Sequence, residues 1–496
     1  MASVANQIVR ALAASGVRRL HAAEGRTGLD DAVDGDPAVR WQRVGREESA
    51  SFGAAGDAAM TGELAVCVSR LGPFDDRLLD GLVDAQLSGL PVLAVAIRAG
   101  SEAEGDPLAD LRAFRLFAER LARPDDIQRM VAAATRAAVE ECGVAVIVVE
   151  EAMLAEHCDA GRPTAIAASR PVVRPREPDL AAAARILAGA RRVAIVAGAG
   201  AAGAQHEVAL LAETLRAPVA HTLRGKEHVE GGPFDVGMVG PLASGWADDA
   251  VAVSDVVLLV GTDLRYRGAH GDDATVVQID VRGSHLGRRC PVDLGLTGTV
   301  LDTLRALQPR LERRFDSSHL DYAVDGYATA RRADDARALD HQNSAAASVA
   351  ALVSRLAEPD AVFAVDTGTE ELSATRHLRM NGERRLIGSF SHGSARGALP
   401  LAVGAQSAHL DRQVIALLGE RGRAHLAEEL PAIARGGLPV KIATVDAGGD
   451  SGIVTQAADL GIRGIRADAA GLADAVAEAL DYDGPALVEF VPRPAP

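Results

Sequence analysis

The sequence predicts an α/β protein built from three doubly wound parallel sheets. Its 496 residues are too many for a single hydrophobic core, and the usual size of roughly 100–200 residues per domain predicts about three domains. Its apolar runs are short and continuous in Val, Ile and Leu, which is typical of strands covered on both faces by helices. Ala- and Leu-rich stretches of helical character separate these runs.

Ten such runs are the predicted strands, in the order in which they occur along the chain. They are LAVCVS (64–69), PVLAVAI (91–97), VAVIVVE (144–150), VAIVAG (193–198), VVLLVG (256–261), VVQIDV (276–281), AVFAVD (361–366), VIALLG (414–419), VKIATVD (440–446) and ALVEFV (486–491).

Two breaks divide these strands into three groups. Residues 161–179 carry four prolines and several arginines without periodicity, which indicates a linker. Residues 327–344 are polar and of helical character. We therefore expect α/β domains near 1–165, 180–325 and 345–496. The first and third groups share the same alternation of strands and helices.

Charge and cysteine usage exclude several classes of protein. With 52 basic and 68 acidic residues the net charge is −16, which repels nucleic acid and anionic membrane surfaces. The four cysteines are scattered without metal-ligand spacing, so neither a zinc site nor a disulfide framework is expected. No apolar stretch is long enough to cross a membrane. We expect a cytoplasmic protein with no nucleic-acid or membrane partner.

The middle group opens with a glycine-rich turn between a strand and a helix. Gly198, Gly200 and Gly203 fit the pattern G-x-G-x-x-G of dinucleotide-binding turns. Asp280 ends a later strand and could bind a ribose hydroxyl, although it lies too far along the chain for the usual NAD fingerprint. The alternative is close packing of the helix on the sheet without any ligand.

Cationic residues follow later strands of the same group. Arg224, Lys226, Arg265 and Arg267 lie in or beside glycine-containing segments, where open α/β sheets bind ligands. These side chains could neutralise a pyrophosphate. The alternative for each is a solvated surface charge.

Four long stretches carry a resemblance to a known family. They are TLRGKEHVEGGPFDVGMVG, LLVGTDLRYR, VVQIDVRGSHLGRRCPVDLGLTGTV and RMNGERRLIGSFSHGSARGALPLAVGAQ. The chain resembles, over most of its length, the pyruvate oxidase and pyruvate:quinone oxidoreductase branch of the thiamine diphosphate enzymes. In that branch the central domain holds FAD in an extended form. The resemblance implies FAD contacts at Gly198, Gly200, Arg224, Lys226, Met238, Gly240, Gly261, Thr262, Arg265 and Asp280.

The first domain resembles the pyrimidine-binding domain of the family in the stretch VRWQRVGREESASFGAAGDAAMTGELAVCV. The resemblance places Glu47 at the catalytic position. A carboxylate there hydrogen-bonds the aminopyrimidine ring and favours its imino tautomer, whose nitrogen deprotonates the thiazolium. The alternative is an acidic residue at a helix start, because Glu47 and Glu48 directly follow Arg46.

The third domain resembles the diphosphate-binding domain. VDTGT (365–369) and GSFSHGS (388–394) match well. They imply diphosphate-facing positions at Gly368, Thr369, Ser391 and His392.

The metal-binding part of that domain departs from the family pattern. Gly419-Glu420-Arg421 stands where the family has Gly-Asp-Gly, and Asp446-Ala447 stands where it has Asn-Asn. Gly419 and Arg421 are thus candidate diphosphate contacts, and Glu420 and Asp446 are the candidate Mg²⁺ ligands. The guanidinium of Arg421 could bind phosphate directly or pair with Glu420. The sequence predicts a rebuilt or eroded metal–diphosphate site.

Two functions follow from the resemblance. In the first, thiamine diphosphate decarboxylates a small 2-oxo acid such as pyruvate and electrons pass to FAD. In the second, the chain keeps FAD without thiamine diphosphate and is a flavin-only oxidoreductase, or a non-catalytic partner or sensor. Active sites of the family form between the first domain of one subunit and the third of another, so the resemblance implies a homodimer or homotetramer.

Overall fold

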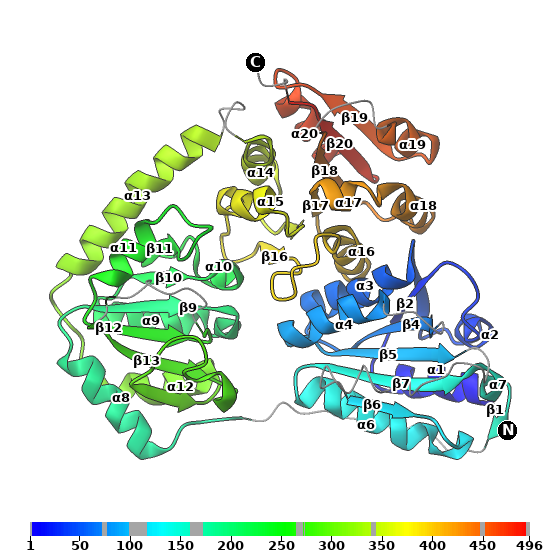
Figure 1. The fold of residues 1–496 in the computed structure, drawn as a ribbon, viewed down its shortest axis with the longest axis horizontal. Helices are drawn as coiled ribbons and strands as arrows, with labels where there is room; N and C mark the ends of the chain where they lie inside the picture. The colour runs from blue at the N-terminus through cyan, green and yellow to red at the C-terminus, as the bar shows by residue number, and fades with distance from the viewer. Residues whose placement is uncertain are drawn as a thin grey trace. The chain divides into compact units, whose positions relative to one another are not determined.

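The computed structural model describes residues 2–71, 77–98, 117–158, 172–263, 271, 273–338, 344–446 and 452–492. The chain divides into two compact units. Unit 1 comprises Met1–Arg170, Leu356–Glu371 and Ile387–Pro496, and unit 2 comprises Pro171–Arg355 and Leu372–Leu386. Figure 1 shows the ribbon and labels most strands of the three sheets.

The first sheet of unit 1 has the strand order β3-β2-β4-β5-β7-β6 with parallel pairs throughout. Its central strand β5 is buried along all its residues, because helices cover both faces. The strands are β2 (Arg19–Ala23), β3 (Arg40–Val44), β4 (Ala65–Leu71), β5 (Val92–Arg98), β6 (Phe117–Arg120) and β7 (Val144–Glu150). The helices are α1 (Val4–Ala14), α2 (Asp30–Asp34), α3 (Glu47–Thr61), α4 (Arg77–Ser88), α6 (Ile127–Glu140) and α7 (Glu151–Leu154). β1 (Ala2–Ser3) and β8 (His157–Cys158) form a separate antiparallel pair.

The second sheet described with unit 1 has the order β16-β15-β17-β18-β20-β19. Numbered from its own first strand, this order is the same as that of the first sheet. The strands are β15 (Val362–Val365), β16 (Arg385–Ile387), β17 (Val414–Leu418), β18 (Lys441–Val445), β19 (Arg463–Ala467) and β20 (Ala486–Phe490). The helices are α14 (Ala345–Leu356), α15 (Thr369–Ala374), α16 (Ala398–Ala408), α17 (Glu420–Arg423), α18 (Leu426–Gly436), α19 (Ile453–Asp459) and α20 (Leu472–Asp481). Of these, α14 up to Arg355 and residues 372–374 of α15 belong to unit 2.

The sheet of unit 2 has the order β11-β10-β9-β12-β13-β14, again with parallel pairs. This is the 3-2-1-4-5-6 order of dinucleotide-binding folds. The strands are β9 (Val193–Ala197), β10 (Val219–His221), β11 (Asp235–Met238), β12 (Val256–Val260), β13 (Thr275–Asp280) and β14 (Leu294–Thr297). The helices are α8 (Glu177–Gly189), α9 (Gln205–Leu215), α10 (Lys226–Val229), α11 (Trp246–Ala252), α12 (Val300–Leu307) and α13 (Ser318–Ala338).

These three sheets confirm the predicted fold class, and all ten predicted strands are present. The polar stretch after residue 327 belongs to α13 as far as Ala338. The proline-rich linker lies outside the described residues up to position 171. Among the described residues, no helix combines the length and the apolar character that a membrane span needs.

Helices α3 and α16 join the two sheets of unit 1 at very close range. A Cβ atom on Gly404 would overlap the carbonyl oxygen of Gly53, and one on Gly56 would overlap that of Leu401. Almost every residue of both helices is buried. This contact explains the small-residue character of the AxFGAAGDAA stretch: the two backbones can meet only without side chains between them.

Candidate functional site

The strand order of the second sheet described with unit 1 reverses at the crevice between β15 and β17. The chain goes from β15 to β16 on one side and then to β17 on the other. Ligands of open α/β sheets bind at such a crevice. Asp366 follows β15 and is 1% exposed. Its carboxylate accepts hydrogen bonds from the backbone N–H groups of Ala398 (3.0 Å) and Gly419 (3.1 Å). Burial nevertheless raises the pKa of Asp366 to about 7.

A second carboxylate, that of Glu371 on α15, lies in the same crevice. A Cβ atom on Gly368 would overlap this carboxylate, and a Cβ atom on Gly419 would come within 2.8 Å of its Cδ atom. Burial raises the pKa of Glu371, and the charge of Glu370 adds to the effect. The structure thus places the predicted Gly368 and Gly419 at the crevice, and an acidic side chain that the sequence interpretation did not single out lies between them.

The predicted pair Glu420 and Arg421 begins the short helix α17, and both residues are exposed. Gly422 follows them and is buried, and a Cβ atom there would overlap the carboxylate of Asp366. Thr369, the first residue of α15, is also exposed.

The candidate metal ligand Asp446 is 2% exposed and lies in a four-charge cluster. Its Oδ1 is 3.2 Å from Nη1 of Arg423, and its Oδ2 accepts a hydrogen bond of 3.1 Å from Nη2 of Arg466. The buried carboxylate of Glu489 on β20 lies 3.7 Å from Arg423 and 3.6 Å from Arg466. Two guanidinium groups therefore balance two carboxylates at the end of β18.

This arrangement does not fit a magnesium ion. Mg²⁺ needs near-octahedral oxygen ligands, and both oxygens of Asp446 already face guanidinium groups. Across the parts of the chain that the structure describes, no group of three or more His, Cys, Asp or Glu side chains could hold a metal. Residue 447, the second position of the family's ligand pair, lies outside these parts.

The predicted diphosphate-facing turn at Ser391 and His392 contacts the first sheet's helix α4. Nε2 of His392 is 3.3 Å from Oδ1 of Asp80, and His392 is exposed. Ser391 is half-buried.

Glu47, the candidate catalytic residue, is the half-buried first residue of α3. It lies near Cys67 on β4, where burial and then the charge of Glu47 raise the pKa of the thiol to about 12. Glu47 therefore stands after the carboxyl end of β3, and its catalytic role stays a prediction.

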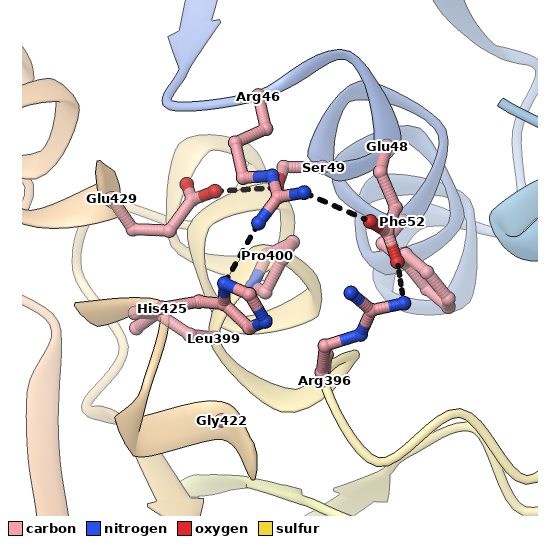
Figure 2. Close-up of a pocket in the computed structure, with 10 residues that line it drawn as sticks. All are labelled: Arg46, Glu48, Ser49, Phe52, Arg396, Leu399, Pro400, Gly422, His425 and Glu429. Atoms are coloured by element: carbon pink, nitrogen blue, oxygen red, sulfur yellow. Dashed lines mark hydrogen bonds and ion pairs between the residues drawn. The ribbon is translucent and has the colours of Figure 1, made fainter. Parts of the chain in front are cut away.

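The neighbouring residues close the space between α3 and the third domain (Figure 2). Glu48 is 3.2 Å from Nη2 of Arg396, and Arg46 is 2.7 Å from Nδ1 of His425. The hydroxyl of Ser49 donates to Glu429, as Figure 2 shows. The pocket between these side chains measures about 20 Å³. Such a volume suits about one water molecule and not an organic cofactor.

In unit 2 the predicted glycines lie at the reversal of strand order between β9 and β12. Gly200 N–H donates to the carbonyl of Gly261 at 3.0 Å. A Cβ atom on Gly198 would lie 2.5 Å from the Cβ of Thr262, and one on Gly200 would lie 2.7 Å from the Cα of Gly261. The two turns thus contact each other directly, at the place where dinucleotide-binding folds hold their ligand. Asp280 follows at the end of β13, where its Oδ1 accepts a 2.8 Å hydrogen bond from the N–H of Arg282.

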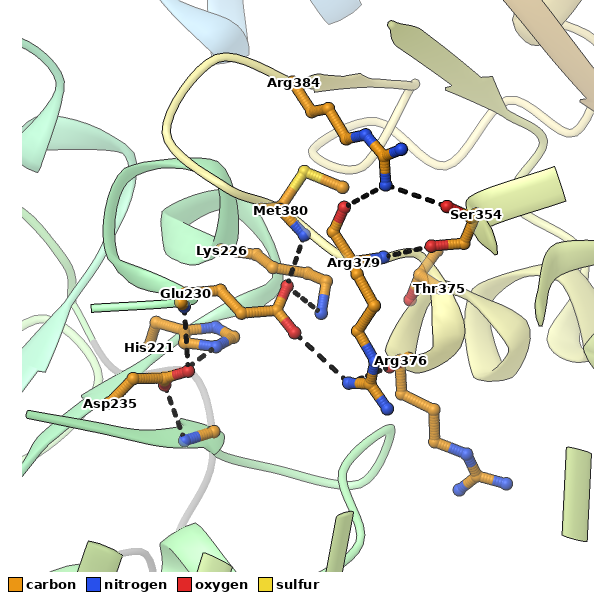
Figure 3. Close-up of polar contacts among 12 residues, drawn as sticks. His221, Lys226, Glu230, Asp235, Ser354, Thr375, Arg376, Arg379, Met380 and Arg384 are labelled. Carbon is orange, nitrogen blue, oxygen red and sulfur yellow. Dashed lines mark hydrogen bonds and ion pairs between the residues drawn. The ribbon is translucent and has the colours of Figure 1, made fainter. Parts of the chain in front are cut away.

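Lys226 is a buried ion-pair partner (Figure 3). Its Nζ is 2.7 Å from Oε2 of Glu230, and burial lowers the pKa of Lys226. Glu230 also lies 3.2 Å from Nη1 of Arg379 and accepts a 3.1 Å hydrogen bond from the N–H of Met380. Figure 3 shows the Lys226 ammonium directed at this carboxylate.

The other predicted flavin contacts are distributed around the same edge. Met238 is buried at the end of β11, and Gly240 N–H donates to the carboxylate of Asp248 at 3.0 Å. Arg224 is half-buried in the turn before α10. Arg265 lies outside the described residues.

Sequence reasoning missed Glu371, Arg423, Arg466 and Glu489. One signal was available, because the acidic pair 370–371 directly follows the matched turn VDTGT. The other three gave none, because Arg423, Arg466 and Glu489 come from three separate elements, α17, β19 and β20.

Comparison with known proteins defines the class. The N-terminal TPP binding domain of thiamine pyrophosphate enzymes matches residues 2–119, the central domain matches 180–307, and the C-terminal TPP binding domain matches 366–449. The chain belongs to the thiamine pyrophosphate enzyme family.

Individual relatives cover two thirds or more of the chain. An uncharacterised 42.6 kDa protein of Pseudomonas amyloderamosa is 36% identical over 344 residues, which are 67% of this chain and 87% of that protein. The putative thiamine pyrophosphate-containing protein YdaP of Bacillus subtilis is 28% identical over 82% of this chain and 72% of its own. Pyruvate oxidase of Lactiplantibacillus plantarum is 29% identical over 87% of this chain and 75% of its own.

Proposed function

We propose that this chain is a flavin-binding relative of pyruvate oxidase that has lost magnesium and thiamine diphosphate and acts as a flavin-only oxidoreductase. The observation that carries the proposal is the pairing of Asp446 with Arg423 and Arg466. To bind a divalent cation, Asp446 would have to give up at least one of these ion pairs or share an oxygen between the cation and a guanidinium group.

Electrostatics at the crevice supports the same proposal. Without Mg²⁺ a diphosphate keeps its negative charge, and the crevice between β15 and β17 presents the carboxyl groups of Asp366 and Glu371. A unit charge on one of these groups opposes a phosphate charge about 4 Å away by about 4 kcal/mol at an effective dielectric constant of about 20. Asp366, whose pKa is raised to about 7, carries only part of that charge near neutral pH. A diphosphate between these groups would therefore be disfavoured.

The flavin half of the proposal rests on unit 2. Its strand order is that of dinucleotide-binding folds, and the glycine turns at 198–200 and 261 stand at the reversal point. The residues that would hold the flavin are those turns, Arg224 and Asp280. A bound flavin would supply transfer of hydride or of single electrons. The buried Lys226 would act through Glu230 on the shape of the turn and not on the flavin itself.

A second candidate function is oxidative decarboxylation of a small 2-oxo acid with thiamine diphosphate and FAD. The observation that favours it is Glu47, which keeps the matched position as the first residue of α3. For either function we expect a homodimer or homotetramer, as in the family that the chain resembles.

The cofactors that remain bound after purification separate the two functions. We expect the absorbance of oxidised flavin in the purified protein, FAD as the ligand identified by mass spectrometry after denaturation, and neither thiamine diphosphate nor magnesium. Thiamine diphosphate and magnesium at one equivalent per chain would refute the proposed function and support the second candidate.

Glu47→Gln provides a second test, with exposed Glu63→Gln as its matched control. The assay is release of CO₂ from pyruvate with thiamine diphosphate, Mg²⁺ and an artificial electron acceptor added. The proposed function predicts no release by the wild type or by either variant. Release that Glu47→Gln abolishes and Glu63→Gln keeps would establish the role of Glu47 in the second function.

A further inference from the structure

The crevice between β15 and β17 contains an acidic side chain of the protein itself. The crevice is bordered by two glycine turns, one after β15 at Gly368 and one after β17 at Gly419. The carboxylate of Glu371 touches both, because a Cβ atom on either glycine would clash with it. The matched C-terminal TPP binding domain includes both turns.

We infer that Glu371 is an internal anion that takes the place of the diphosphate between these two turns and excludes the cofactor from this domain. The inference deepens the thiamine half of the proposed function and does not depend on the flavin half. It assigns the exclusion to one side chain in the crevice, in addition to the ion pairs of Asp446.

Helix geometry explains how Glu371 reaches this place. It is the third residue of α15, and a glutamate at that position can turn back toward the residue before the helix, which here is Gly368. A negative charge is also favourable at the first turn of a helix. This local role accounts for the contact with Gly368.

The contact with Gly419 has a different origin. Gly419 follows β17, a separate strand that pairs with β15 in parallel, so no local helix-capping rule brings it to Glu371. The Oε1 and Oε2 atoms of Glu371 each lie 3.0 Å from the position that a Cβ atom on Gly419 would take. The carboxylate therefore spans the crevice from one turn to the other, which is the place of a bridging anion.

Among the described residues, no arginine or lysine forms an ion pair with Glu371. Asp366 adds a second carboxyl group, and the charge of Glu371 contributes to the raised pKa of Asp366 after the larger effect of burial. Arg423 and Arg466 are balanced by Asp446 and Glu489. A diphosphate would enter against the charge of Glu371 and would have to displace its side chain.

The test compares Glu371→Gln with Glu370→Gln in the full chain. Glu370 is the exposed neighbour on the same helix and controls for loss of one negative charge. Inorganic pyrophosphate is titrated into each protein by isothermal titration calorimetry, first without metal and then with Mg²⁺. We expect no saturable binding by the wild type or Glu370→Gln. We expect Glu371→Gln to bind pyrophosphate with a Kd at least about tenfold below the weakest Kd that the titration can detect.

Two results would overturn the inference. One is pyrophosphate binding by the wild type as tight as that by Glu371→Gln. The other is no binding by a folded Glu371→Ala, which removes both the charge and the side chain from the crevice. Thermal unfolding checks that both variants are folded. The flavin absorbance of the same samples reports separately on the proposed function: its absence would contradict flavin binding and leave the assignment of Glu371 intact.

Discussion

The buried carboxyl group of Asp366 makes the stability of the protein depend on pH in a way that a single substitution removes. Its usual pKa is 3.8, and burial raises the pKa to about 7 in the folded protein. Between these values the folded protein holds a proton that the unfolded chain has released. The stabilisation is therefore complete below about pH 4 and is lost as the pH rises through about 7.

The magnitude follows from the difference between the two pKa values. A shift of about 3 units corresponds to about 4 kcal/mol in full, since each unit is worth about 1.4 kcal/mol. About 2.5 kcal/mol of this is lost between about pH 5 and about pH 8, because the proton is already partly released by the unfolded chain at the lower pH. Asp366→Asn should remove this loss. It should also cost about 1 kcal/mol at every pH, because an amide oxygen replaces only one of the two acceptors that Ala398 and Gly419 use.

The assay is urea unfolding of wild type and Asp366→Asn at about pH 5 and about pH 8, followed by the free energy of unfolding. Exposed Asp411→Asn is the control and should keep the wild-type pH dependence. All other titrating groups are common to the proteins and cancel in the comparison. Equal pH dependence in wild type and Asp366→Asn would refute the reasoning, because it would mean that this carboxyl group titrates alike in the folded and unfolded chain.

Two further predictions concern packing and buried charge. Glu230→Gln should lower the stability of unit 2 by about 3–5 kcal/mol, because Lys226 and Arg379 lose the buried carboxylate between them. The midpoint of urea unfolding measures this loss. The control is the exposed ion pair between Glu213 and Arg313, where Glu213→Gln should change stability by less than about 1 kcal/mol. Gly404→Ala should destabilise unit 1 by about 1–3 kcal/mol or more, because the added methyl group overlaps the backbone of α3. Gly436→Ala, where the nearest neighbour is 3.4 Å away, should be close to neutral when both variants are compared by the same urea unfolding measurement.

Much of the fold could be predicted because the inner strands carry their own signal. A strand such as β5 or β17 is covered on both faces, so nearly all its residues are apolar. The strands that the sequence did not reveal include every edge strand of the three sheets, for example β3 (RWQRV) and β19 (RGIRA). An edge strand has one neighbour and more solvent, which leaves room for charged side chains and removes the continuous apolar run.

The same contrast holds for the candidate site. The sequence by itself determined the glycine turns, the parallel sheets and the positions of Glu47, Glu420 and Asp446 along the chain, because these depend on local backbone requirements and apolar patterning. Only the tertiary structure decided that the oxygens of Asp446 face Arg423 and Arg466, and that Glu371 lies between the turns after β15 and β17. Those contacts join segments that are distant in the chain, and parallel strands bring such segments together through strand order and side-chain direction, which no short stretch of sequence contains.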